Sequence, residues 1–322
     1  MGKRASAKKH GRTNGASQWQ RLLATVGILL AYAFAHCAHA GNDVQTTFDS
    51  TEAAVDALVE AVKVNDVTML GSILGPRTRK LLDSGDEVAD AHGREAFLRE
   101  YSEANKIVTE DDGRATLLVG TDEWPLPIPL VKFGERWHFD SAEGEKEIIA
   151  RRIGTNELSA IQICVAIVEA QNDYAGQVAA VDGVPHYAAR FASSPGKHDG
   201  LYWQSNADES PSPLGPLLAA AAQEGYTSAE VKPLAPYHGY YYKILTRQGD
   251  NAPGGAYDYF VRGKLIGGFA VLAYPARYGA SGVMTFMFNH DGVVYEKNLG
   301  RKTQDVAAGI SRFDPDQTWH KQ

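Results

Sequence analysis

Two short segments of the chain gather the side-chain types that could bind a ligand or perform chemistry. The first contains a histidine-aspartate pair followed by two aromatic residues, and the second contains a histidine among tyrosines. The candidate ligand-binding residues are His198, Asp199, Tyr202, Trp203, His238, Tyr240 and Tyr242. Aromatic walls with a few convergent polar groups are typical of small-ligand sites, and a histidine there can act as an acid, a base or a metal ligand. We hypothesise one aromatic pocket, formed if the loop carrying the first segment folds over a sheet carrying the second.

The same residues also fit a structural interpretation. Tyrosines commonly anchor loops, Asp199-Gly200 is a turn signal, and adjacent residues of an extended segment, such as His198 and Asp199, point to opposite faces. The sequence shows no nucleophile elbow, phosphate-binding loop or metal-ligand spacing. We therefore predict no catalytic residue, no metal and no cofactor, and the choice between a small-ligand site and a structural cluster stays open.

The element that must position these segments is residues 156–174, NELSAIQICVAIVEAQNDY. Apolar residues recur there at helical spacing on two faces. One face carries Ile161, Val165 and Val168, and the other carries Ile163, Ile167 and Tyr174. A helix that is apolar nearly all round over residues 161–168 should lie between two packed layers rather than on a surface. We expect this helix to start near Asn156 and to end at a left-handed cap at Gly176. Cys164 within it is predicted to be an inert core residue.

The N-terminus has the pattern of an export signal. Six lysines and arginines precede an apolar run over residues 22–35, which is followed by Ala38-His39-Ala40, a small-x-small cleavage pattern. We predict a signal peptide over residues 1–40, cut after Ala40, and a periplasmic or secreted protein without a membrane span after cleavage. The alternative is a retained anchor, although a run of about 14 residues is short of the roughly 20 that a spanning helix needs.

Cleavage would change the charge of the chain. The formal net charge is −7, and the loss of six positive charges and no negative ones takes it to −13. Nucleic acid and anionic lipid need clustered positive charge on a partner, so this balance disfavours both. The expected partner is an unknown envelope protein or a small ligand.

The N-terminal half, residues 45–153, begins with helix patterns. Asp49 is the expected N-cap of a first helix, whose core face carries apolar residues at i, i+3, i+4 and i+7. These residues are Val55, Leu58, Val59 and Val62. Asp66 is the expected cap of a second short helix, and residues 94–104 are expected to form a third.

A sheet is predicted to follow these helices, because the apolar period changes from about 3.6 to 2 after residue 105. The predicted antiparallel strands are residues 106–110, 114–120, 125–133 and 136–140, with Val131, Trp137 and Phe139 facing the core. Three prolines in the third strand cannot donate ladder hydrogen bonds and place it at an edge or partly outside the sheet. A polar linker helix over residues 143–152 would then lead to the central helix.

The C-terminal half, residues 154–322, is predicted to combine a long loop with an antiparallel sheet. Residues 187–216 form the loop, and a short helix follows over residues 217–224. The predicted strands are residues 240–247, 257–261, 268–274, 283–289 and 293–299. The last two form a hairpin around Asp291-Gly292, which is the clearest local signal in the chain.

Two resemblances at the level of fold follow from these patterns. Short helices followed by a curled antiparallel sheet, with VKFGERWHFD at its end, resemble the nuclear-transport-factor-like cone fold. The helix ending in EAQNDYA, the GYYY strand and the hairpin VMTFMFNHDGVVY resemble the pilin-like α/β roll, without the prepilin cleavage site and the filament-forming helix. The overall fold class is thus expected to be α+β, with a long central helix between the two parts.

The chain from residue 48 to residue 319 also resembles a bacterial family of exported proteins, the domain of unknown function DUF2950. The segments that carry the resemblance are FDSTEAAVDALVEAV, EWPLPIPLVKFGERWHFD, RRIGTNELSAIQIC, SSPGKHDGLYW, PYHGYYYKILTRQG and SGVMTFMFNHDGVVYEKNLG. The resemblance implies an envelope compartment and brings no catalytic residues. We therefore expect an exported envelope protein with a non-catalytic binding or structural role. The alternatives are a small-molecule binder or hydrolytic enzyme using the aromatic and histidine residues, and an accessory protein of a secretion or pilus-like system.

Overall fold

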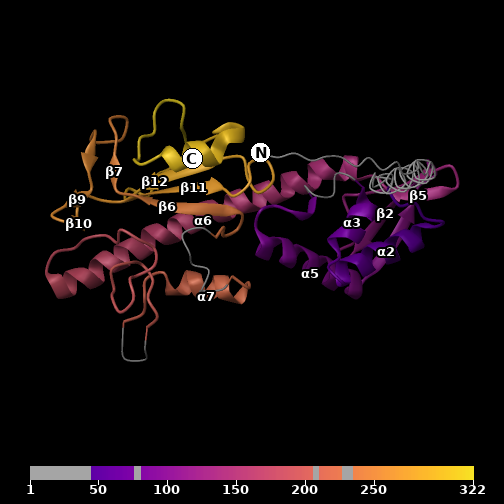
Figure 1. The fold of residues 1–322 in the computed structure, drawn as a ribbon, viewed down its shortest axis with the longest axis horizontal. Coiled ribbons are helices and arrows are strands. Elements are labelled where there is room, and N and C mark those ends of the chain that lie inside the picture. Colours follow the sequence, from indigo (N-terminus) through magenta and orange to yellow (C-terminus); the bar gives the residue numbers. More distant parts are fainter. Residues whose placement is uncertain (1–44, 76–80, 206–209, 227–234) are drawn as a thin grey trace, which may run out of the picture. The chain divides into compact units, whose positions relative to one another are not determined.

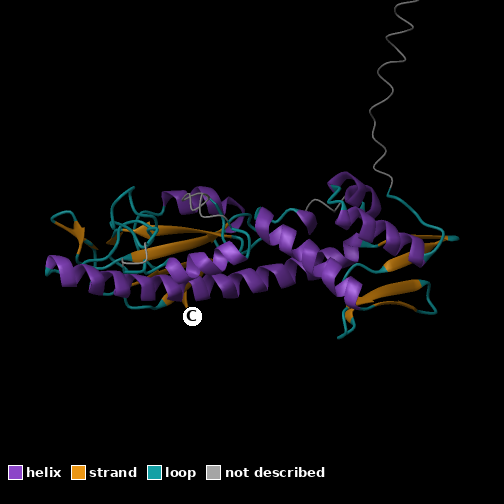
Figure 2. Cartoon of the chain, turned by 90° about the horizontal axis from the view of Figure 1, so that it is seen from below, coloured by secondary structure: helices purple, strands orange, loops and turns teal. Residues whose placement is uncertain are grey.

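The computed structural model describes residues 45–75, 81–205, 210–226 and 235–322, which belong to one compact unit, Gln45–Gln322. The predicted signal peptide, residues 1–40, lies outside the described residues. Helices and antiparallel strands make up this unit, which confirms the α+β class (Figure 1; Figure 2). The described residues form a five-stranded sheet in the N-terminal part, and a second five-stranded sheet with two two-stranded sheets in the C-terminal part.

The N-terminal part packs three helices with a small antiparallel sheet. The helices are α2 (Thr51–Lys63), α3 (Val67–Leu74) and α5 (Glu87–Glu103). The strands are β1 (Asn105–Thr109), β2 (Arg114–Val119), β3 (Trp124–Pro125), β4 (Leu130–Phe133) and β5 (Arg136–Phe139), in the order β1-β2-β4-β5 with β3 on β2. The predicted core face of α2 is confirmed, since Val55, Leu58 and Val59 are buried and Val62 packs against the same core.

Two helix starts differ from the prediction. Ser50, and not Asp49, caps α2, because its Oγ accepts a hydrogen bond from the Ala53 amide at 3.1 Å, while Asp49 pairs with Arg136. The helix α5 begins at Glu87 rather than at residue 94, since the side chain of Asp86 caps it there. Residues 87–93 contain only one large apolar side chain, Val88, and no residue of α5 is buried. The first two turns of the helix therefore show no apolar period in the sequence.

The third predicted strand, residues 125–133, is two strands in the structure. Proline-rich residues interrupt it, and the short strand β3 pairs only with β2, as expected for a segment that lacks amide donors. The predicted inward position of Val131 is wrong. Leu130 lies opposite Phe139 in the β4–β5 register and shares its buried face, whereas Val131 lies opposite His138.

The linker helix and the central helix form a single helix, α6 (Ser141–Asp182), of 42 residues. The predicted start near Asn156 is therefore wrong: the helix continues through Gly154, whose helix-propensity cost of about 1 kcal/mol does not end it. Gly176 lies inside α6, and the left-handed glycine that follows the helix is Gly183, with φ of 70°. The predicted boundary between residues 153 and 154 thus falls within a continuous helix.

Only one face of α6 is buried in its C-terminal half, contrary to the prediction of burial on both sides. The buried residues follow a helical stripe of Ala160, Ile163, Cys164, Ile167, Ala170, Gln171 and Tyr174. The opposite side leaves Leu158 66% and Val165 48% exposed. Periodicity shows which residues are apolar and does not show whether a second layer exists to cover them.

The sheet of the C-terminal part, rather than the helix, lies between two layers. Its strands are β6 (Tyr240–Leu245), β11 (Ala270–Pro275), β12 (Thr285–Asn289), β13 (Val294–Lys297) and β14 (His320–Lys321), in the order β14-β13-β12-β11-β6. Side chains alternate along β12: Phe286 and Phe288 pack with α6, and Met287 packs on the other face. That other face is covered by the helix α8 (Thr303–Gly309) and the segment after it, through Ala307 and Phe313.

The remaining elements agree in part with the sequence. The hairpin around Asp291-Gly292 joins β12 and β13 as predicted, and Gly292 has φ of 73°. The short helix α7 (Gly215–Gln223) follows a loop that packs on α6 through Ala188, Leu201 and Trp203. Residues 240–247 and 257–261 each break into two strands: β6 and β7 (Arg247–Gln248), then β8 (Tyr257–Asp258) and β9 (Phe260–Val261). The strand β10 (Lys264–Leu265), the strand β14 and the helix α8 are additional to the prediction.

Candidate functional site

The first predicted segment, residues 198–203, serves mainly to close its own loop. The Asp199 carboxylate accepts hydrogen bonds from the Ser194 amide at 2.7 Å and from the Ser194 hydroxyl at 2.9 Å. These bonds, with the amide bond the larger cause, hold the pKa of Asp199 below its ordinary value. The His198 ring stacks on Trp203 with centroids 4.2 Å apart, and the Tyr202 amide donates to the Phe191 carbonyl.

The second predicted segment contains a histidine in contact with a carboxylate and two tyrosines that pack in the core. His238 has a left-handed backbone with φ of 48°, and its Nε2 lies 3.1 Å from Oε2 of Glu224. Tyr240 is fully buried and donates its hydroxyl to the Met284 carbonyl at 2.9 Å. Tyr242 packs against the same core, and burial raises its pKa well above the ordinary value.

The two segments share the core beneath α6. Trp203 and Tyr240 are buried in it, and Tyr202 and Tyr242 pack against it. Among the described residues, no hydrogen bond or ring contact joins residues 198–203 to residues 237–242. The indole Nε1 of Trp203 is buried and has no hydrogen-bond partner in this part of the chain. The aromatic pocket that the sequence suggested stays a prediction.

A buried carboxylate, Asp86, ties distant parts of the chain together and was absent from the candidates. It is 1% exposed and accepts from the hydroxyl of Tyr226 at 2.9 Å and from the amide of Gly239 at 2.8 Å, in addition to capping α5. Gly239 has φ of 73°, and a Cβ there would meet Nδ2 of Asn156 at 2.4 Å, so only glycine fits this approach. We call Asp86, Tyr226 and Gly239 the Asp86 cluster.

A second carboxylate, Glu157 on α6, is also engaged by backbone donors. Its Oε1 accepts from the amides of Val283 and Met284, each at 2.9 Å. The neighbouring Asn156 donates to the Ser281 carbonyl at 2.8 Å. These bonds fix the segment before β12 against the helix, which gives the polar residues Asn156 and Glu157 a structural role at the start of the apolar stretch of α6.

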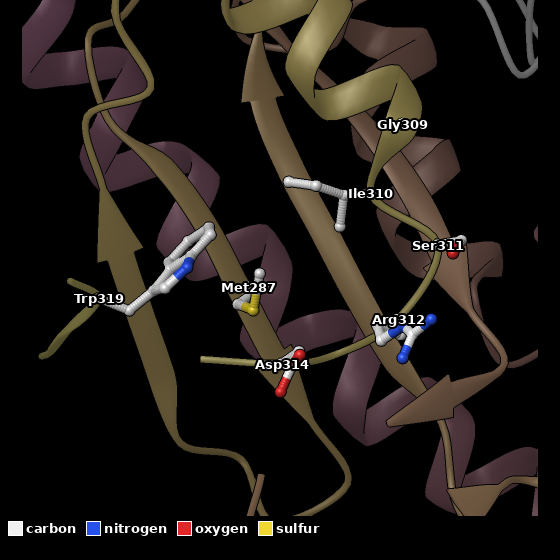
Figure 3. A pocket seen from close by; sticks show the side chains of 7 residues that line it. All are labelled: Met287, Gly309, Ile310, Ser311, Arg312, Asp314 and Trp319. Carbon is white, nitrogen blue, oxygen red and sulfur yellow. The ribbon is translucent and has the colours of Figure 1, made fainter. Parts of the chain in front are cut away.

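A hollow of about 300 Å³ opens on the other face of the C-terminal sheet (Figure 3). We call it the Trp319 hollow, and its lining consists of Met287, Gly309, Ile310, Ser311, Arg312, Asp314 and Trp319. Figure 3 shows Trp319 on one side of Met287, and Ile310, Arg312 and Asp314 on the other. The buried Met287 belongs to β12, so a sheet strand supplies an apolar part of the lining and the C-terminal segment supplies the polar groups.

The segment that forms one wall of the hollow is held at several points. Nζ of Lys243 donates to the carbonyl of Ile310 at 2.8 Å. The Phe313 amide donates to the Arg247 carbonyl at 3.0 Å, and its ring is fully buried. Oδ1 of Asp314 accepts from the amide and the side chain of Asn251, both at 2.9 Å. The wall is therefore formed before any ligand arrives.

One positive group belongs to the lining of the hollow and another lies beside Trp319. Arg312 is exposed and makes no ion pair or hydrogen bond with any residue that the structure describes. Nζ of Lys297 lies 5.7 Å from the centroid of the Trp319 ring. Asp316 is engaged by Thr318, whose side chain and amide hold the pKa of Asp316 below its ordinary value. The sequence reasoning missed this site, because its residues belong to three separated segments without a motif.

The comparison with family models relates most of the chain to one family. The model of the family described as "Protein of unknown function (DUF2950)" matches residues 45–322. The chain belongs to the DUF2950 family. A search of curated proteins and a search of solved structures each found no match.

Two further observations describe this DUF2950 chain. Within the described ranges, no group of three or more histidine, cysteine, aspartate or glutamate side chains is arranged to hold a metal ion. Within Ser141–Val178 of α6, an 18-residue window has the apolar composition of a membrane span, with a mean hydropathy of 1.2 and 33% of the window buried. The core helix of a globular domain passes the same test, and the buried stripe of α6 packs on the sheet.

Proposed function

We propose that this DUF2950 protein is an exported, non-catalytic binding protein of the bacterial envelope. The observation that carries the proposal is the contrast between three carboxylates that are hydrogen-bonded within the fold and an arginine that has no such partner. Asp86, Glu157 and Asp199 each accept hydrogen bonds from donors of the chain itself, whereas Arg312 belongs to the lining of a hollow and has no partner in the described residues. Acid-base catalysis needs carboxylates within reach of a substrate proton, and recognition needs an unpaired group in a concave site.

Export is supported by the basic and apolar pattern of residues 1–40 and the cleavage pattern ending at Ala40. The mature chain would start at Gly41 and carry a strongly negative net charge, which favours a partner or ligand other than nucleic acid.

The experiment is cell fractionation followed by native mass spectrometry of the full-length gene product. We expect the protein in the periplasm or medium, with the mass of residues 41–322 plus a discrete bound mass. The control variant Ala40→Asp, which spoils the cleavage site, should keep the longer chain. A wild-type protein that stays in the cytoplasm with its first 40 residues, or an exported protein that turns over a substrate, would contradict the proposal.

A second candidate function is a small-molecule binder or hydrolytic enzyme at the His238 region. The observation that favours it is the contact between Nε2 of His238 and Oε2 of Glu224, which lie 3.1 Å apart. The His238 ring lies beside the rings of Tyr226 and Tyr237, and the backbone of His238 has a positive φ, which is a feature of many functional sites. Burial, and then the charge of Glu224, raises the pKa of Tyr237 to about 12. Loss of ligand binding or turnover in His238→Ala, with binding kept in His198→Ala, would favour this candidate.

The third possibility is an accessory protein of a secretion or pilus-like system. It draws on the pilin-like and nuclear-transport-factor-like analogies, which we keep as proposals because fold alone does not define function. A helix packed on one face of an antiparallel sheet is compatible with the first analogy. Failure of the protein to co-purify with any envelope assembly after cross-linking in cells would remove this possibility.

A further inference from the structure

We infer that the Trp319 hollow binds a small organic carboxylate with a flat apolar body. The inference gives a site and a ligand class to the binding role proposed above, and it rests on that role. A volume of about 300 Å³ lies at the lower end of small-ligand pockets, which span about 300–1,000 Å³. The hollow therefore suits one ring with a short substituent.

The apolar part of the lining suits a ring. Met287 is 2% exposed and contributes from β12, while Ile310 and Trp319 are partly exposed on opposite sides (Figure 3). An aromatic ring gains from offset stacking on an indole and from contact with a thioether sulfur. A flat apolar body placed over Met287 would use both contacts.

The charges of the hollow select a carboxylate. Arg312 presents a planar guanidinium with no partner in the described residues, and its donors match the two oxygens of a carboxylate. Lys297 adds a second positive charge beside Trp319. The acidic group of the lining, Asp314, uses its Oδ1 to accept two hydrogen bonds from Asn251.

The rigidity of the wall adds to this selectivity. Before Arg312, the segment is held by Lys243 of β6, which donates to the Ile310 carbonyl. After Arg312, the Phe313 amide donates to the Arg247 carbonyl of β7, and the Asp314 carboxylate accepts from Asn251. A preformed site loses less conformational entropy on binding than a flexible one, so even a small ligand can bind there.

The test is a titration of the full ¹⁵N-labelled chain, followed by the indole NH signal of Trp319, which the variant Trp319→Phe assigns. The probes are benzoate and its uncharged analogue benzamide. We expect benzoate to shift this signal at millimolar concentration and benzamide to bind at least about tenfold more weakly. Arg312→Gln should weaken benzoate binding by at least about tenfold and leave benzamide unchanged.

The matched control is Arg262→Gln, which removes the same charge at an exposed turn outside the lining. Its benzoate affinity should equal that of the wild type. No response to benzoate, equal binding of benzoate and benzamide, or equal affinities of Arg312→Gln and Arg262→Gln would each overturn the inference. The dispersion of the remaining amide signals shows that each variant is folded.

Two sources of the carboxylate are possible, a free metabolite and the C-terminus of a peptide. Tighter binding of N-acetylphenylalanine than of benzoate supports a peptide end, and the reverse supports a metabolite. Failure of this inference is distinguishable from failure of the proposed function. A silent Trp319 signal in an exported protein that carries a bound mass removes only the hollow, whereas cytoplasmic retention removes the proposed function whatever benzoate does.

Discussion

The Asp86 cluster and the Trp319 hollow use charged side chains in opposite ways. Asp86 is 1% exposed and accepts from Tyr226, Gly239 and the first turn of α5. Arg312 is exposed at a concave surface and contacts no acceptor among the described residues. A buried charge must be satisfied by the fold, while an exposed and unpaired one is available to a ligand. The carboxylate that the fold itself uses as a hydrogen-bond acceptor is therefore not the group to expect at the proposed binding site.

The largest effect should come from the Asp86 cluster. Asp86→Ala leaves the hydroxyl of Tyr226 and the amides of Gly239 and Ala89 without their acceptor, so we expect a loss of about 3 kcal/mol or more in the free energy of unfolding. Urea unfolding followed by circular dichroism measures it.

Asp66→Ala is the matched control for that change. Asp66 also caps a helix, α3, but is exposed and accepts only from the amides of Thr68 and Met69. We expect a loss of about 1 kcal/mol. Equal losses in the two variants would show that the tertiary bonds of Asp86 contribute nothing.

The next largest effect on stability is expected from substitutions of His238, because its backbone is left-handed. His238→Gly and His238→Ala both remove the pair with Glu224, but only glycine adopts φ of 48° without a Cβ penalty. We expect the glycine variant to be the more stable by about 0.5–1 kcal/mol, since the greater freedom of unfolded glycine offsets part of the relief. Thermal unfolding of the pair gives the difference, and a more stable alanine variant would show that no strain is stored there.

A smaller effect should appear in the pH dependence of Asp199→Asn. The folded pKa of Asp199 is depressed by its bonds with Ser194, so the charged form stabilises the fold above the unfolded pKa. That stability is lost as the pH falls through the folded pKa. After allowance for solvent screening, the wild type should exceed the variant by a few tenths of a kcal/mol at neutral pH. The two urea midpoints should converge in acid, and a constant gap at all pH values would contradict this cause.

No loss of stability is expected for Arg312→Gln. Its side chain holds no described group, so the free energy of unfolding should stay within about 0.5 kcal/mol of the wild type. A loss comparable to that of Asp86→Ala would mean that Arg312 is a structural residue, and the contrast between the two regions would fail.

Much of the fold could be predicted because its signals are local. The face of α2, the cap at Asp66 and the hairpin at Asp291-Gly292 depend on residues close in sequence. The continuity of α6 and its exposed side could not be predicted, since they depend on which layers pack against it.

The sites show the same limit. The sequence indicated His238, whose pair with Glu224 the structure shows, but gave no reason to combine Arg312, Met287 and Trp319. These three residues are brought together by the strand β12 and the turn before β14, and such long-range proximity leaves no periodic signal.

Hydrogen–deuterium exchange of the protein, with and without a deproteinised small-molecule extract of the cells that express it, tests the account most directly. We predict that the extract protects peptides covering residues 309–319 and leaves residues 84–90 and 237–240 unchanged. The same pattern should be absent in Arg312→Gln and present in Arg262→Gln. Protection around His238 with none at the Trp319 hollow would contradict the account and move the binding site to the second candidate.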